Sequence, residues 1–277
     1  MNNNIFFILC HQDDEFGLFN VIEKATKKQK NVFVIYLTSG LKTNNQNSKN
    51  KLLQRDKESL KVLLKLGVSR NNIFFLGKKF NIPVYNLYKN LNIVYQEINK
   101  FLKKHQSKHI IYTHSWEGGN EDHDACFVIV KKIIYQNSKI TKAFEFAHYH
   151  NHKTKIFPFK VQKFISDKRK IYRTKIKFDD KIKYINYLFN YISQIYLWLP
   201  IFPLVIIRIL MNDYGNLKMI KKNLIIKKPH NGTLLYEKLR KKEYVYFKGT
   251  DSPKEGVSEK IILSGPNGDV VLDAMEV

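Results

Sequence analysis

Ionisable side chains crowd together directly after the first apolar run of the chain. The stretch ILCHQDDEF, residues 8–16, places a histidine and three acids behind residues 5–10, which are apolar and β-prone. Groups packed this tightly repel one another unless a partner such as a divalent metal ion neutralises them. If a helix begins here, His11 and Asp14 lie three residues apart and share a face, whereas Asp13 points elsewhere. The spacing therefore offers two metal ligands and one free carboxylate.

A second polar cluster, THSWEGGNEDHDA at residues 113–125, follows another apolar run that ends at Tyr112. It contains His114 and His123, and its two glycines predict a tight loop before a helix. A catalytic zinc typically takes three protein ligands and keeps a position open for water, so His123 in the first helical turn could supply the third. The acids at either helix start could instead serve only as caps. Two such clusters together favour a metal site.

The elements that must position both clusters alternate between strands and helices. Apolar runs at 5–10 and 31–40 flank a helical pattern, and this order predicts a parallel sheet. Further helices are predicted at 51–67, 91–105 and 122–137, and further strands at 71–77, 108–115 and 142–150. Ligands of such sheets bind outside the carboxyl ends of the strands. We predict a Rossmann-like layered α/β fold with a mostly parallel sheet, whose core is residues 1–150.

The second half of the chain has a different character, because residues 177–212 form one long apolar-rich region. Its uncharged run from Ile192 to Ile207 is shorter than a bilayer needs and is interrupted by prolines. Three interpretations stay open: core or the wall of a substrate channel, a segment resting on a membrane surface, or a spanning helix. Trp198, several tyrosines and flanking lysines suit a membrane boundary.

Turn formers and acids become frequent from about residue 249. We therefore predict one domain over residues 1–248, with 177–212 as its C-terminal apolar subregion. Residues 249–277 are predicted to be an appendage, either loose or folded as a small hairpin.

The chain of 277 residues is strongly basic, with 48 Lys and Arg against 24 Asp and Glu and a formal net charge of +24. This balance attracts nucleic acid, anionic lipid or phosphorylated substrates, although a general compositional bias would give the same surface. The N-terminus lacks the features of a signal peptide, and two cysteines, Cys10 and Cys126, imply no disulfide framework. We expect a cytoplasmic protein, with the inner face of the membrane as a candidate docking surface.

The two polar clusters resemble the motifs of the LmbE/PIG-L metal-dependent N-acetyl sugar deacetylases. HQDDE at 11–15 looks like the family's HPDDE, and EGGNEDHDA at 117–125 looks like its second motif, which usually reads GHPDH. Softer matches follow in the family's order at LTSG (37–40), RDKESLKVLLKLGV (55–68) and KIKYINYLFNYISQ (181–194). The resemblance spans roughly residues 4–195.

This resemblance implies a hydrolase that uses Zn²⁺, or another divalent metal, to remove the N-acetyl group from an amino sugar such as N-acetylglucosamine. Carried over by position, His11, Asp14 and His123 would hold the metal and Asp13 would be the general base. Arg55 would be a candidate for binding substrate hydroxyls or a phosphate. The alternative for Arg55 is a structural pairing with Glu58 on its own helix.

Two departures from the family pattern affect this expectation. Gln12 replaces a proline, which alters only the rigidity of the turn. Asn120 stands where the family has a histidine that stabilises the oxyanion or protonates the leaving group. An asparagine still donates a hydrogen bond but carries no proton at neutral pH. Either Asn120 substitutes in part, His114 supplies the group, or activity is reduced.

The expected substrate is a phosphate- or lipid-linked glycan precursor in cell-surface polysaccharide or lipopolysaccharide synthesis, favoured by the basic charge and the apolar stretch 192–210. Thr38 is a further candidate for substrate contacts, and residues 229–237 could border the pocket. Competing classes are a metal-binding family member with little hydrolase activity, a membrane-surface scaffold, and a basic nucleic-acid-binding α/β protein. No recognised nucleic-acid motif accompanies the basic runs, so no specific nucleic acid is expected.

Overall fold

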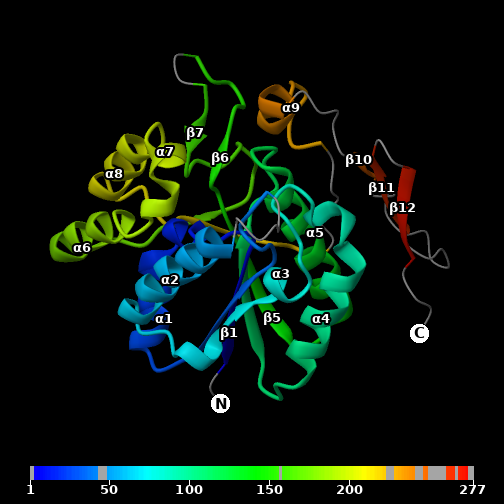
Figure 1. The fold of residues 1–277 in the computed structure, drawn as a ribbon, viewed down its shortest axis with the longest axis horizontal. Helices are drawn as coiled ribbons and strands as arrows, with labels where there is room; N and C mark the ends of the chain where they lie inside the picture. Colours follow the sequence, from blue (N-terminus) through cyan, green and yellow to red (C-terminus); the bar gives the residue numbers. More distant parts are fainter. Residues whose placement is uncertain are drawn as a thin grey trace.

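A central sheet organises the molecule, and its strands are β1 (Asn4–Leu9), β2 (Asn31–Tyr36), β3 (Ile73–Phe75), β4 (His109–His114), β5 (Ile140–Phe146), β8 (Ile171–Tyr172) and β9 (Leu217–Met219). Their order in the computed structural model is β3-β2-β1-β4-β5-β9-β8. Figure 1 shows β1 and β5 in the middle of the molecule, with helices around them. The strands from β3 to β5 run parallel, and β9 pairs antiparallel with both β5 and β8. The prediction of a layered α/β fold with a mostly parallel sheet is confirmed. The structure describes residues 3–42, 49–155, 158–222, 228–240, 246–248, 260–265 and 268–273.

The chain changes direction across the sheet at β1. It builds β2 and β3 outward on one side of β1, then returns to place β4 and β5 on the other side. The carboxyl ends of β1 and β4 are therefore neighbours, with Phe7 opposite Tyr112 in the register. Such a switch point is where open α/β sheets bind ligands. Both polar clusters of the sequence follow these two strand ends.

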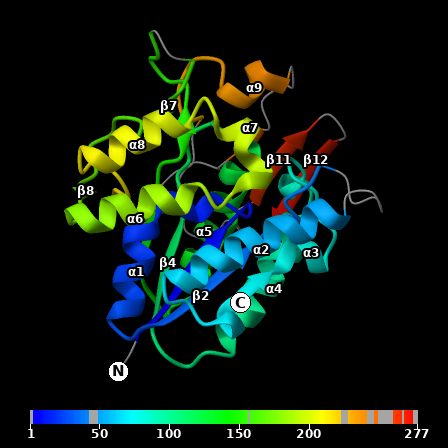
Figure 2. The ribbon, with the colours of Figure 1, turned by 60° about the vertical axis from the view of Figure 1, so that its left-hand side comes forward.

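Two helical layers cover the sheet. Side chains alternate along each strand, so that apolar residues on both faces need a cover. Phe7 and Leu9 of β1 face one core, whereas Phe6 and Ile8 face the other. The first core is closed by α1 (Phe19–Lys27), α2 (Lys49–Lys65), α6 (Phe178–Leu188) and α8 (Phe202–Leu210). The second is closed by α4 (Leu91–Lys103) and α5 (Glu121–Gln136). Figure 2 shows α6 between α8 and α1, so the C-terminal half completes the first layer.

The single strand predicted at 142–150 is wrong in one respect. The structure has β5 up to Phe146 and then a separate strand, β6 (Tyr149–His150), which pairs with β7 (Lys160–Val161). Between them the backbone N–H groups of His148 and Tyr149 donate to Glu117 Oε1, at 2.8 and 3.0 Å. Because this buried carboxylate binds the two N–H groups, the backbone leaves the main sheet after β5 and forms the separate strand β6.

The apolar region 177–212 folds as α6, a short turn, α7 (Ile195–Trp198) and α8. Within the described ranges, no helix alone has the length and apolar character for a bilayer crossing. The segments Ile192–Trp198 and Phe202–Leu210 have sufficient length and apolar character only when they are taken together, and a 92° bend separates them. Near the C-terminus, β11 (Lys260–Gly265) pairs antiparallel with β12 (Gly268–Asp273) and with β10 (Tyr246–Lys248). The division into a domain and an appendage stays a prediction, and residues 249–259 lie outside the described residues.

Candidate metal and catalytic site

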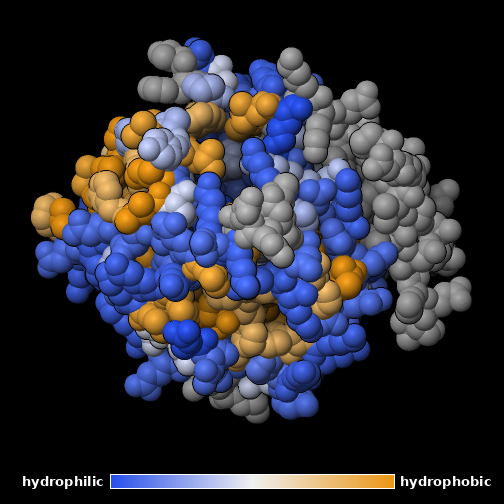
Figure 3. Space-filling view, in the orientation of Figure 1, coloured by the Kyte–Doolittle hydropathy of each residue, from blue (hydrophilic) through white to orange (hydrophobic). Residues whose placement is uncertain are grey.

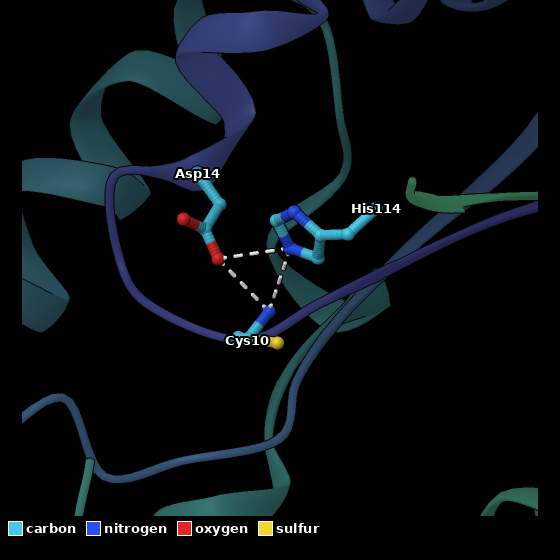
Figure 4. Close-up of side chains that lie close together, drawn as sticks. All are labelled: Cys10, Asp14 and His114. Atoms are coloured by element: carbon cyan, nitrogen blue, oxygen red, sulfur yellow. Dashed lines mark hydrogen bonds and ion pairs between the residues drawn. The ribbon is translucent and has the colours of Figure 1, made fainter. Parts of the chain in front are cut away.

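The two polar clusters meet at the carboxyl ends of β1 and β4. Potential ligand atoms of His11, Asp14 and His123 lie within 4.8 Å of one another, and so do those of Cys10, Asp14 and His114. Figure 4 shows Asp14 and His114 facing each other across the end of β1. All of these residues are buried. The structure therefore brings together the residues predicted as metal ligands.

Asp14 is the centre of the cluster, because four imidazoles approach its carboxylate. One oxygen, Oδ2, lies 3.0 Å from His114 Nε2 and 3.5 Å from His11 Nδ1. The other, Oδ1, lies 3.2 Å from His123 Nε2 and 3.5 Å from His148 Nε2. The backbone N–H of His11 also donates to Oδ2, at 2.6 Å, which fixes the turn that follows β1.

The electrostatics of this cluster favour an ionised Asp14, neutral imidazoles at His123 and His148, and a protonated His11. Burial alone would raise the pKa of Asp14, but the imidazoles of His114, His123 and His11 hold it well below its usual value. Burial and repulsion from His114 lower the pKa of His123 to about 3. Burial also opposes protonation of His11, yet the carboxylates of Asp14 and Asp122 raise its pKa to about 10. His123 thus has the neutral form that a metal ligand needs, and a cation would replace the proton on His11.

Unpaired ring nitrogens in the cluster are a second observation that fits a bound divalent cation. Buried ring nitrogens of this cluster lack hydrogen-bond partners in the described structure, namely Nδ1 of His114 and of His123 and both nitrogens of His148. Unpaired buried polar atoms are costly and need an explanation. Imidazole and carboxylate ligands in a buried cluster are typical of zinc.

Asp122 orients His11 from the opposite side of the cluster. His11 Nε2 lies 3.0 Å from Asp122 Oδ2, which leaves Nδ1 to face Asp14. The carboxylate of Asp122 also accepts the backbone N–H groups of Tyr85 and Leu87, at 2.5 and 3.0 Å. A carboxylate held in this way fixes the tautomer and the orientation of a histidine ligand.

We expect Asp122→Asn to weaken metal affinity by about 10- to 100-fold, because loss of such an outer carboxylate lowers the basicity and order of the ligand. Competition with a chromophoric chelator measures the affinity. Asp124→Asn is the matched control, since Asp124 is buried in the same helical turn but accepts from the backbone N–H groups of Glu117 and Gly118. Equal affinities of both variants and the wild type would show that Asp122 does not act through His11.

Asp13 lies beside the cluster in a strained turn, with a φ of 133° that L-residues rarely adopt. Its Oδ2 accepts from the indole Nε1 of Trp198 at 3.1 Å, and its Oδ1 lies 3.4 Å from Arg55 Nη2. Burial raises the pKa of Asp13 to about 7, although the Arg55 charge opposes this rise. A carboxylate with a pKa near neutrality suits proton transfer.

Arg55 and Thr38 bond to the backbone beside Asp13. Arg55 donates to the carbonyls of Gly40 and Gln12, at 2.6 and 2.8 Å, and Thr38 donates to the carbonyl of Cys10 at 2.8 Å. Both side chains are buried. Their predicted contacts with substrate stay predictions.

Glu58 does not pair with Arg55, which was the alternative expected for that helix. Its carboxylate accepts instead from the backbone N–H and the hydroxyl of Ser193, at 2.9 and 2.5 Å. Two residues earlier, Tyr191 donates its hydroxyl to Glu15 at 2.8 Å. The segment around Tyr191 and Ser193 thus ties the C-terminal half to the loop after β1.

Asn120 caps α5, since its Oδ1 accepts from the backbone N–H of Asp122 at 2.9 Å. Its Nδ2 lies 3.3 Å from the hydroxyl oxygen of Tyr149. A Cβ on Gly119 would lie 1.8 Å from the carbonyl oxygen of Tyr149, so only glycine allows this close approach. The loop before α5 and β6 are therefore packed directly against each other.

Sequence reasoning missed three side chains of the site: His148, Tyr149 and Trp198. The first two were assigned to an ordinary strand, and Trp198 to a membrane or core segment. The sequence AHYH at 147–150 carries one detectable signal, a pair of histidines after a strand of the parallel sheet.

The fold and the site define a layered α/β protein with a buried His/Asp cluster at the switch point of its sheet. Residues 6–134 match the PIG-L family model, described as GlcNAc-PI de-N-acetylase, and they form a domain of this LmbE-like family. The resemblance inferred from the motifs is therefore confirmed. No curated protein matches the chain by sequence.

Similar solved structures include N,N'-diacetylchitobiose deacetylase from Pyrococcus horikoshii. It has 15% identity and a TM-score of 0.59, and covers 79% of this chain and 84% of its own. A triple mutant of a deacetylase of the teicoplanin biosynthetic pathway has 13% identity and a TM-score of 0.57, with coverage of 79% and 98%. At these identities the similarity establishes a shared fold.

Proposed function

We propose that this chain is a metal-dependent N-deacetylase that removes the N-acetyl group from an amino-sugar derivative. The observation that carries the proposal is the convergence of His11, His123 and two further imidazoles on Asp14, with Asp13 beside them in a strained turn. The PIG-L domain over residues 6–134 supports the same reaction class.

His11, Asp14 and His123 would hold the cation, which is Zn²⁺ or another divalent metal. When bound, such a cation lowers the pKa of a water molecule towards about 7 and polarises the amide carbonyl. Asp13 then takes a proton from the attacking water as the water oxygen bonds to the carbonyl carbon. The same carboxyl returns this proton to the nitrogen as the C–N bond breaks, and acetate and a free amine leave.

Asn120 is the proposed hydrogen-bond donor to the oxyanion, because its Nδ2 faces Tyr149, whose ring centroid lies 5.6 Å from that of His123. His114 is less suited to this role, since its Nε2 already contacts Asp14 and the backbone N–H of Cys10, deep in the cluster. Losing one oxyanion donor costs on the order of 100- to 1000-fold in rate. A metal-binding protein with little hydrolase activity is therefore the second candidate.

The experiment is metal analysis of protein purified without a histidine tag, followed by acetate release over a panel of N-acetylated sugars. The proposal expects about one metal ion per chain and acetate release that a chelator abolishes. Bound metal with no release over the whole panel would favour the second candidate. Strongly salt-dependent DNA affinity with no bound metal would favour the nucleic-acid-binding class.

An exposed apolar face adjoins the proposed base and supports a lipid-linked substrate. Tyr196, Leu197 and Leu199 are 89, 68 and 66% exposed, whereas Trp198 between them is buried against Asp13. Figure 3 shows apolar side chains gathered over α6, α7 and α8. With its net charge of +24, such a face suits the surface of an anionic membrane.

We propose that this face rests on the inner side of the membrane. There the enzyme would act on a phosphate- or lipid-linked glycan precursor of cell-surface polysaccharide or lipopolysaccharide. We expect the double variant L197D/L199D to lose most of its binding to vesicles rich in anionic lipid, because charges do not enter the acyl region. Flotation of vesicles measures the bound fraction.

The control for this prediction is Tyr135→Asp, which places a charge on an exposed aromatic position of α5, in the other helical layer. This variant should float like the wild type. Equal flotation of the double variant and the wild type would contradict docking through α7, and binding only to neutral vesicles would contradict the role of charge.

A further inference from the structure

A cavity of about 630 Å³ lies at the end of β6, where Asn151 follows the strand. Its walls come from Asn151 to Lys153 after β6, from the loop 229–233, from residues 165–166 and from Lys238 of α9 (Leu235–Arg240). This volume is within the range of about 300–1,000 Å³ for small-molecule sites. Of the described residues that line it, none is acidic.

The polar groups of this cavity are arranged for an anion. Lys153 and Lys238 both line it, and among the described residues neither forms an ion pair. Glu237, next to Lys238 in the sequence, is engaged by Lys228 at 3.6 Å and by the backbone N–H of Leu234 at 2.5 Å. His230 Nε2 is buried and has no hydrogen-bond partner in the described structure.

A cation is a poorer occupant, although the rings of His152 and His230 lie with their centroids 4.9 Å apart, tilted at 39° to each other. The next imidazole, His150, is bound through Nε2 to the carbonyl of Lys163 at 2.6 Å. Since none of the described lining residues is a carboxylate, the cavity would leave a metal's charge uncompensated beside two lysines. An ammonium group is a common point-charge partner of phosphate, and an unpaired imidazole N–H adds a donor.

The cavity connects to the cluster through two direct links. Along β6, the Tyr149 hydroxyl reaches Asn120, and Asn151, two residues further, lines the cavity. At about 3.3 Å per residue, the backbone of Asn151 lies about 7 Å beyond that of Tyr149. The opposite wall is tied to the same loop, because Leu235 N donates to Gly118 O at 3.0 Å and Asn151 Nδ2 donates to Thr233 O at 2.8 Å.

We propose that this cavity is the subsite for the phosphate group of the substrate, with Lys153, Lys238 and His230 as its donors. The inference rests on the proposed function for the acetamido end of the same molecule. The substrate class becomes an N-acetylated amino sugar that carries a phosphate monoester or a diphosphate link.

The test measures binding by calorimetry, without turnover, for the wild type and for the double variant K153A/K238A. The probes are N-acetylglucosamine 1-phosphate and the neutral methyl glycoside of N-acetylglucosamine. We expect the Kd of the phosphate to rise about tenfold per lysine removed, because a charged hydrogen bond is lost each time, and the Kd of the glycoside to stay unchanged. K104A/K108A is the charge-matched control, at exposed positions before β4, and should bind both probes like the wild type.

An unchanged Kd for the phosphate in K153A/K238A would overturn the subsite. Equal weakening of both probes, or no phosphate binding by the wild type, would overturn it too. A third probe is the same sugar joined through a diphosphate to a polyprenyl chain in detergent. Comparing its Kd with that of the sugar phosphate shows whether the cavity prefers a lipid-linked diphosphate or a phosphate monoester. Acetate release is recorded separately, so an inactive protein that still discriminates between the probes refutes the hydrolase and not the subsite.

Discussion

Asp14→Asn should abolish stoichiometric metal binding and, with it, acetate release. Asp14 is the residue that every imidazole of the cluster approaches, at 3.0 to 3.5 Å. The amide keeps the size of the side chain but removes the negative charge and leaves one oxygen in place of two. Metal analysis after dialysis measures the outcome, and we expect less than about a tenth of the wild-type content, because a ligand is lost outright.

Glu15→Gln is the control for this loss. Glu15 is a buried carboxylate in the same turn, but it bonds to the Tyr191 hydroxyl and to the backbone N–H of Asp13. Its variant should therefore keep the metal. If the Asp14→Asn protein retained one metal ion per chain, the cluster would not be the metal site.

Asp13→Asn should retain the metal yet lower kcat by about 100- to 10,000-fold, which is the usual contribution of a general base. The amide still accepts a hydrogen bond from Trp198 but takes no proton from water. Since Asp13 contacts Arg55 and Trp198 instead of the predicted ligands, the metal content should stay at the wild-type level. Steady-state acetate release and metal analysis of the same sample measure both quantities.

The companion variant is Trp198→Phe, which removes the donor to Asp13 but keeps an aromatic ring in the core. A smaller loss of kcat than in Asp13→Asn is expected, since only the orientation of the base changes. Wild-type turnover by Asp13→Asn would show that another group takes the proton.

Local signals were sufficient for much of the fold and for the candidate ligands that the structure brings together. Buried strands followed by helical patterns identified β1 and β4, and polar residues directly after them identified His11, Asp14 and His123. These residues depend on short-range spacing and on a topological rule that places neighbouring strand ends together. The same reasoning could not reveal Trp198, which reaches Asp13 across 185 positions of the chain.

The remaining differences arise where tertiary contacts override local patterns. The residues 142–150 alternate like one strand, but Glu117 binds the backbone of His148 and Tyr149 and redirects the chain. Asp122 looked like a helix cap, yet its carboxylate contacts His11 and two backbone N–H groups. Each of these roles depends on a partner that is distant in the sequence. Periodicity and composition describe only local stretches and could not predict these contacts.

The most direct test of the metal site is anomalous diffraction at the zinc absorption edge from crystals of the metal-loaded protein. The account predicts one peak per chain, bonded at about 2.0–2.2 Å to a nitrogen of His11, an oxygen of Asp14 and a nitrogen of His123. A peak bound elsewhere, or none in protein that contains stoichiometric zinc by mass analysis, would contradict the proposed site.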